Sequence, residues 1–325
     1  MSTPLPVGVV GVGALGRHHA RHYATMHGAS LVGVYDANPA QAAKVAEEVG
    51  TRAFADLDDL LQAVRAVSVA VPTSYHRDVG LQCLGRGVAV LMEKPLAVTL
   101  AEADEMLAEA ARQGVVFAVG HVERFNRAVR AAQTVLEAPL FIEGVRLAPF
   151  QPRGTDVAVV LDLMIHDLDL ANHLVGGAPA HDVRANGVSV LSSHLDMVNA
   201  RVEFEGGLVA SMTASRVARD RVRRLRLFQP SGYISIDLAE GSGTFMRLRD
   251  GWRPGMGSSI EEIVEMIPLV APEADALGLE LAAFVAAVRG ERAAIVTATE
   301  GRAALALAVE VTAAVQRSPQ PRLGR

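Results

Sequence analysis

The chain has one cysteine, no excess of positive charge and no long uninterrupted apolar run. Cys83 is the only cysteine among 325 residues, which excludes an internal disulfide framework and a multi-cysteine metal site and indicates a reducing compartment. The formal net charge of −5 gives no reason to expect binding to nucleic acid or to an anionic membrane. Because the sequence shows neither a secretory leader nor an apolar run that could cross a bilayer, we expect a soluble cytoplasmic protein.

Short apolar runs alternate with amphipathic stretches over the first 120 residues. Each run is nearly all apolar, as in parallel strands that are covered on both faces. These runs occupy residues 7–12, 31–36, 66–71, 88–92 and 115–120. Helical patterns lie between them, so the sequence predicts an α/β fold in which residues 1–122 form a doubly wound parallel sheet.

The pattern changes after residue 122. A helix-like piece, a strand-like piece and a long helical stretch come first, at 126–137, 140–148 and 157–177. Strand-like runs then follow one another without helices between them, at 181–190, 196–205, 208–216, 223–230, 233–238 and 244–249. Two helical stretches, 275–289 and 298–316, close the chain. We therefore expect residues 123–325 to form an α+β domain with a large, mostly antiparallel open sheet.

The first apolar run leads into the pattern Gly-x-Gly-x-x-Gly. A strand precedes this pattern, a helix follows it, and Asp36 stands at the end of the second run, which is the context of a dinucleotide-binding loop. The residues expected to contact the cofactor here are Gly11, Gly13, Ala14, Leu15 and Gly16. A carboxylate at position 36 suits the ribose hydroxyls of NAD and would repel the 2′-phosphate of NADP, so the sequence favours NAD.

Polar residues follow three later runs of the predicted sheet. Ligands in such folds bind outside the carboxyl ends of the strands. Simple solvent exposure of a strand end would explain one such polar group, but it explains three of them less well. The first two groups are expected to contact the cofactor. The first group consists of Pro72, Thr73 and His76, and the second of Glu93 and Lys94, which precede Pro95. The third group is expected to contact substrate, as is Lys94, and consists of Glu123, Arg124 and Asn126.

A polar stripe runs along the long helical stretch. Asp162, His166, Asp169 and His173 are spaced four, three and four residues apart, which places them on one helix face. The stripe could be a solvated face, a metal site or an acid–base pair in which Asp162 orients His166. No further histidine-rich segment completes a metal shell, and the polar strand ends favour the acid–base interpretation.

Arginines are concentrated between residues 216 and 226. A solvated sheet face accounts for most of them. Since the planar guanidinium suits phosphate oxygens, one or two could pair with a substrate diphosphate. Arg216, at the end of a strand-like run, is the preferred candidate.

Taken together, the glycine loop, Glu93-Lys94-Pro95, residues 119–126 and the pair Asp162 and His166 resemble the Gfo/Idh/MocA oxidoreductases. The resemblance implies an NAD-binding Rossmann domain at 1–122 and a substrate-binding and oligomerisation domain at 123–325. In this family the open sheet of the second domain commonly forms dimer or tetramer contacts, so a homodimer or homotetramer is expected. The resemblance also implies the catalytic triad Lys94, Asp162 and His166. No metal is expected.

Three segments, 119–126, 162–171 and 215–237, are most similar to family members acting on UDP-N-acetylhexosamines, such as the UDP-N-acetylglucosamine 3-dehydrogenases. The expected reaction is hydride transfer from a sugar carbon to NAD, with a sugar or UDP-sugar as substrate. His166 would be the general base, and it would also contact the substrate. The alternatives are a dehydrogenase of a free polyol, inositol or aldose, one that retains and recycles its cofactor, or a non-catalytic nucleotide-binding regulatory protein.

Overall fold

A computed structural model describes residues 3–151, 157–257 and 259–318. The chain divides into two compact units. The first consists of Met1–Val122 with Asp275–Arg302, and the second of Glu123–Ala274 with Ala303–Arg325. Within the described ranges, no helix is long and apolar enough to span a membrane.

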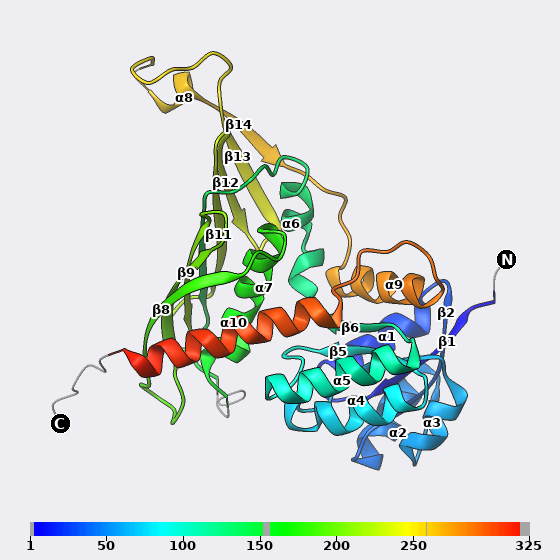
Figure 1. The fold of residues 1–325 in the computed structure, drawn as a ribbon. Helices are drawn as coiled ribbons and strands as arrows, with labels where there is room; N and C mark the ends of the chain where they lie inside the picture. Colours follow the sequence, from blue (N-terminus) through cyan, green and yellow to red (C-terminus); the bar gives the residue numbers. More distant parts are fainter. Residues whose placement is uncertain (1–2, 152–156, 258, 319–325) are drawn as a thin grey trace. The chain divides into compact units, whose positions relative to one another are not determined.

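The first unit is a doubly wound sheet, as the alternating pattern predicts (Figure 1). Its six strands have the order β3-β2-β1-β4-β5-β6, and all neighbours are parallel. The strands are β1 (Leu5–Val10), β2 (Ala29–Tyr35), β3 (Arg52–Ala53), β4 (Ala66–Val69), β5 (Ala89–Glu93) and β6 (Phe117–Gly120). The helices are α1 (Gly16–Thr25), α2 (Pro39–Val49), α3 (Leu57–Ala63), α4 (His76–Gly85), α5 (Leu100–Gln113) and α9 (Ala276–Val288).

Local sequence signals set the ends of α5. The Thr99 side chain accepts a hydrogen bond from the Glu102 backbone, and the Glu102 carboxylate accepts one from the Thr99 backbone. Gly114 ends the helix in the left-handed conformation. This pair of signals starts and stops the helix where the sequence predicts.

Helix α9 packs on the first unit, although the sequence pattern placed residues 275–289 in the second domain. Its buried side chains Leu281, Phe284 and Val285 join the apolar core that contains the strands β1 and β5. The sequence of a short apolar helix does not show which core the helix packs into, because the hydrophobic effect is non-directional and any apolar core would suit it. The division between the units also falls within α10 (Ala298–Arg317), after Arg302.

The second unit is built on an eight-stranded sheet with the order β14-β13-β12-β11-β7-β10-β9-β8. The pair β7 and β10 is parallel and the other neighbours are antiparallel, which confirms the mostly antiparallel sheet. The strands are β7 (Phe141–Leu147), β8 (Ala180–Val188), β9 (Met197–Phe204), β10 (Val209–Ser215), β11 (Val222–Gln229), β12 (Gly232–Asp237), β13 (Ser242–Leu248) and β14 (Val264–Leu269). The edge strand β14 was not predicted, because Pro268 and Glu265 weaken the strand pattern there.

One face of this sheet carries the core of the second unit. The α-helices and π-helical turn of this unit are α6 (Arg127–Ala132), η3 (Val160–Met164), α7 (Ile165–Leu174), α8 (Ile260–Ile263) and most of α10. Buried residues of α6, α7 and α10 pack with inward-facing residues of the strands, and Figure 1 shows α7 and α10 along the sheet. Strand β9 shows the alternation, since every second residue from Val198 to Phe204 is buried.

Phe284→Ala tests the assignment of α9 to the first core. Phe284 is 0% exposed, so its truncation leaves a cavity and should lower the free energy of unfolding by about 3–5 kcal/mol. Urea unfolding followed by circular dichroism measures this loss. Val98→Ala is the control, because Val98 is 48% exposed in the same unit and its truncation should change stability by less than about 0.5 kcal/mol. Equal midpoints for the two variants would contradict the assignment.

Candidate active site

The glycine loop lies where the strand order of the first unit reverses, between β1 and β4. In this topology ligands bind at that point, outside the carboxyl ends of the strands. Gly11 follows β1 with a φ of 80°, a conformation that favours glycine. A Cβ atom on Gly11 would lie 2.8 Å from Val71 and 2.9 Å from the Ala70 carbonyl. The loops after β1 and β4 therefore touch, and only glycine permits that contact.

The other two glycines of the loop have different functions. A Cβ atom on Gly16 would lie 1.8 Å from the Gly11 carbonyl oxygen, so glycine is required for α1 to start so close to β1. The Cβ position of Gly13, in contrast, has no described atom within 4 Å. Gly13 thus leaves open space beside the start of α1, where the backbone N–H groups of a helix favour a phosphate. This cradle fits the pyrophosphate of a dinucleotide.

The Asp36 carboxylate is fixed beside the glycine loop. Its Oδ2 accepts a hydrogen bond from the Val12 backbone at 2.8 Å, and its Oδ1 accepts one from the Asn38 backbone at 2.9 Å. Gln41 in α2 donates to the Val12 carbonyl at 2.7 Å and holds the loop from the other side. Each carboxylate oxygen keeps acceptor capacity, which fits the hydroxyls of a ribose.

His76 supports the loops rather than standing open at the strand end. Its ring is buried, with Nε2 at 3.0 Å from the Val71 carbonyl and Nδ1 at 3.0 Å from the Pro95 carbonyl. Burial lowers the pKa of His76 below its usual value, so the neutral ring is favoured. The predicted cofactor contact of His76 stays a prediction. Pro72 and Thr73, on the same loop, are partly or fully exposed, and their cofactor contacts stay predictions.

Lys94 stands in a turn that is anchored by its neighbour Glu93. The Lys94–Pro95 peptide bond is cis, and Glu93 Oε2 accepts the Lys94 backbone N–H at 3.3 Å. Glu93 Oε1 lies 3.0 Å from Nε2 of His19 on α1. Burial alone would raise the pKa of Glu93, but the hydrogen bond with His19 and the charges of His19 and Lys94 bring it below its usual value. An ionised Glu93 thus ties the turn that presents Lys94 to the helix that opens at Gly16.

His19 was not predicted. It lies on the buried face of α1 together with Gly16, Ala20 and Tyr23. A polar residue at helical spacing on an otherwise apolar face is the signal that could have identified it.

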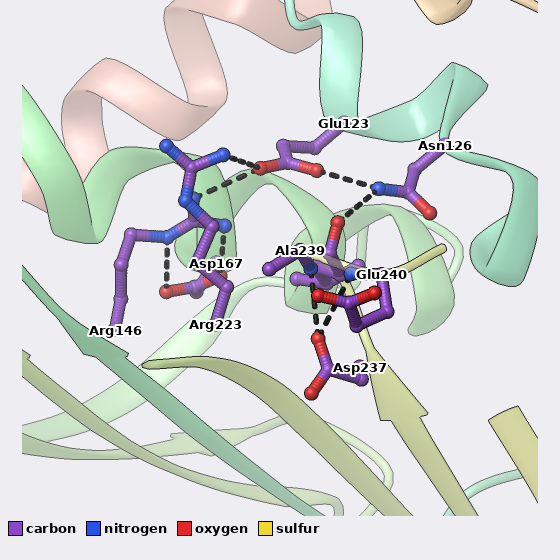
Figure 2. A network of polar contacts seen from close by, with 9 residues as sticks. Glu123, Asn126, Arg146, Asp167, Arg223, Asp237, Ala239 and Glu240 are labelled. Carbon is purple, nitrogen blue, oxygen red and sulfur yellow. Dashed lines mark hydrogen bonds and ion pairs between the residues drawn. The ribbon is translucent and has the colours of Figure 1, made fainter. Parts of the chain in front are cut away.

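A buried ionic network lies at the centre of the second unit (Figure 2). Arg146 in β7 is 3% exposed and donates to Asp167 at 2.9 and 2.7 Å and to Glu123 at 2.9 Å. Burial would lower the pKa of Arg146, but the two carboxylates raise it above its usual value. Asn126 completes the network by donating to Glu123 and to the Leu238 carbonyl. Glu123 and Asn126 therefore have structural partners, and their predicted contacts with a substrate stay predictions.

The polar stripe of the long helical stretch divides into two parts. Asp169 is fully buried and holds Arg124 through two hydrogen bonds of 2.8 and 2.6 Å, and Nδ1 of His173 lies 3.2 Å from the same guanidinium. Arg124, predicted to contact substrate, is thus buried in a bidentate pair. Asp162 and His166, in contrast, are partly exposed.

The helix that carries Asp162 and His166 begins with a π-helical turn. This turn spans Val160–Met164, and α7 follows directly from Ile165. Single π turns within helices occur frequently at functional sites. Across the described residues, no group of three or more His, Cys, Asp or Glu side chains is arranged to hold a metal ion.

Asp162 also lines a pocket of about 240 Å³ in the second unit. The other residues of the pocket are Arg146, Leu147, Ala148, Pro149, Gln151, Leu163, Arg216, Arg221 and Arg223. Arg216, the predicted diphosphate contact, is 5% exposed. It donates to the Val157 carbonyl and lies 3.8 Å from Asp196. Arg216 therefore forms part of the pocket wall, and its contact with a diphosphate stays a prediction.

Comparison with known proteins gives one consistent result. Residues 5–121 match the model of the GFO_IDH_MocA oxidoreductase family with an NAD-binding Rossmann fold, and residues 148–235 match the GFO/IDH/MocA C-terminal domain. The chain is 39% identical to UDP-N-acetylglucosamine 3-dehydrogenase of Acidithiobacillus ferrooxidans over 95% of this chain and 96% of that protein.

Two further comparisons, one with a solved structure and one with a more distant relative, define the range of the likeness. A solved structure of UDP-N-acetylglucosamine 3-dehydrogenase from Acidithiobacillus ferrooxidans has a TM-score of 0.90 and 38% identity, with 97% of this chain and 98% of that chain covered. The scyllo-inositol 2-dehydrogenase of Bacillus subtilis is 29% identical over 65% of this chain and 67% of that protein. The sequence, the fold and the matches agree, and this chain belongs to the Gfo/Idh/MocA family of oxidoreductases.

Proposed function

We propose that this oxidoreductase is an NAD-dependent dehydrogenase that oxidises a ring hydroxyl of a UDP-N-acetylhexosamine, with the 3-hydroxyl of UDP-N-acetylglucosamine as the first candidate. One observation carries the choice of an anionic sugar: Asp162 shares its pocket with four arginines. A neutral polyol or inositol offers no charge for such a pocket, whereas a nucleotide sugar has a diphosphate. The likeness to the Acidithiobacillus enzyme supports the same substrate class.

The geometry of the first unit supports a set of cofactor contacts. The glycine loop, from Gly11 through Ala14 and Leu15 to Gly16, would hold the pyrophosphate, and Asp36 would accept hydrogen bonds from the adenosine ribose. Pro72, Thr73 and Lys94 would lie along the remainder of the cofactor. When bound, the nicotinamide supplies the hydride acceptor.

The chain itself supplies the proton chemistry. His166 takes the hydroxyl proton as the sugar carbon is oxidised, and Asp162 supports the imidazolium that forms. Lys94 donates a hydrogen bond to the same sugar oxygen and stabilises its developing negative charge. Glu93, held by His19, keeps the Lys94 turn in place.

A homodimer or homotetramer formed through the open sheet remains part of the proposal, as does a cytoplasmic location. Phe141, Phe228 and Tyr233 form a row of aromatic contacts on β7, β11 and β12, with ring centroids 5.9 and 4.8 Å apart. Phe228 is 42% exposed in this row. An exposed aromatic row on a sheet face supports association with a second copy.

Lys94→Met and His166→Gln test the catalytic assignment. Each should lower kcat with UDP-N-acetylglucosamine and NAD by about 10²–10⁴-fold, because each removes a proton donor or acceptor at the sugar oxygen. The rate is followed by the absorbance of reduced nicotinamide, and cofactor binding by titration with NADH. The exposed residues Lys44 and His27 provide the matched controls Lys44→Met and His27→Gln. Near-wild-type turnover in both test variants would refute the assignment, and oxidation of scyllo-inositol but not of the UDP-sugar would refute the substrate.

Asp36→Ser tests the preference for NAD. Loss of charged hydrogen bonds to the ribose should weaken NADH binding by about 10- to 100-fold and should leave NADPH binding unchanged or tighter. The Kd values of NADH and NADPH, measured by nicotinamide fluorescence, give the ratio. Asp59→Ser in α3 is the control, since Asp59 is exposed in the same unit. Tighter binding of NADPH than of NADH by the wild-type protein would show that the preference was assigned wrongly.

A further inference from the structure

We propose that Arg221 and Arg223 are the residues that bind the diphosphate of the substrate, in place of the Arg216 that the sequence favours. This inference rests on the proposed function, because it takes a nucleotide sugar as the ligand. Both arginines line the pocket that contains Asp162. The same pocket would therefore hold the anionic part of the substrate and place its sugar near the proposed acid–base pair.

The four arginines of the pocket differ in how far their donors are already used. Arg146 has its Nε and both terminal nitrogens bonded to Asp167 and Glu123. Arg216 is buried and donates to the Val157 carbonyl. Both side chains therefore hold the wall of the pocket together through bonds to the protein, and both are buried.

Arg221 and Arg223 keep donors for a ligand. Arg221 is exposed, and the described residues provide it with no hydrogen bond or ion pair. The Nη1 atom of Arg223 lies 3.8 Å from Glu123 Oε1, which is too long for a hydrogen bond. Two guanidinium groups that still have N–H donors, two residues apart in the chain, suit two adjacent phosphoryl groups.

The strand register brings two arginine side chains together at the pocket. Arg223 in β11 stands directly opposite Arg146 in β7, and Glu123 is the carboxylate that faces both guanidinium groups (Figure 2). Like charges at paired positions of a sheet oppose each other. In agreement with this, burial and the charge of Arg146 lower the pKa of Arg223 below its usual value. Glu123 and Asp167 together offset the charges of Arg146 and Arg223, and Arg221 adds a further positive charge at this wall, which a phosphate dianion would offset.

Arg221→Gln and Arg223→Gln test the site, with Arg224→Gln as the matched control. Arg224 is exposed and alternates in direction with Arg223 along the strand, and it does not line the pocket. Calorimetric titration of the NADH-bound full-length protein with UDP, and separately with inorganic pyrophosphate, should show about 10- to 100-fold weaker binding in each test variant. The control should remain within about twofold of the wild type. With UDP-N-acetylglucosamine, KM should rise in the test variants while kcat stays near the wild-type value, since the contact is made equally before and during the chemical step.

Each outcome separates this inference from the proposed function. If the test variants, with wild-type circular dichroism, bind UDP and pyrophosphate as tightly as the wild type, the inference is wrong even where UDP-N-acetylglucosamine is oxidised. It is equally wrong if the wild-type protein binds neither probe. If pyrophosphate binds the wild type and the control but not the test variants, the anion site is established. It would then stand even if no UDP-sugar is oxidised, and only the proposed function would fail.

Discussion

The second unit depends on the buried charge of Arg146. A guanidinium this deeply buried is stable only when carboxylates surround it, and losing one partner of such a group costs about 3–5 kcal/mol. Asp167 comes from α7, and Glu123 comes from the 3₁₀ turn η2 (Val122–Phe125). Arg146 in β7 therefore bonds both segments to the sheet. The helix with Asp162 and His166 is therefore held in place by electrostatics as well as by apolar packing. The position of Asp162 in the wall of the pocket depends on this ionic network.

The first unit uses the same principle around Lys94. His19 and His76 are buried polar residues, Glu93 is partly buried, and each connects separate segments of the chain. His76 joins the loop after β4 to the turn after β5, and the pair of His19 and Glu93 joins that turn to α1. Because buried polar groups are costly unless they are paired, these contacts permit few alternative arrangements. The open cradle at Gly13 and the anchored Lys94 turn are both consequences of loops fixed in this way.

Much of this architecture could be predicted from periodicity and short motifs. The parallel sheet and five of its six strands, the glycine loop and the capping residues Thr99 and Gly114 are signalled by local patterns that can be recognised in one sequence, whereas the two-residue strand β3 is too short to show such a pattern. Partners far apart in the chain could not be predicted. Nothing in the sequence indicates that Asp169 pairs with Arg124, that Asp167 pairs with Arg146, or that α9 packs into the core of the first unit. Spacing placed four polar residues on one helix face, but only tertiary contacts show that Asp169 and His173 lie against Arg124.

Because of the π turn at Val160–Met164, the orientation of Asp162 depends on the number of residues in this segment as well as on their identity. One residue of an α-helix corresponds to a rotation of about 100° around the axis. The extra residue of a π turn therefore sets the angular offset between Asp162, inside the turn, and His166, in the regular helix beyond it. Deletion of a single residue there could restore regular helical hydrogen bonding and still turn the carboxylate away from the pocket. In relatives of this chain, a gap at this position would alter the direction of Asp162 relative to His166 even where both residues are retained.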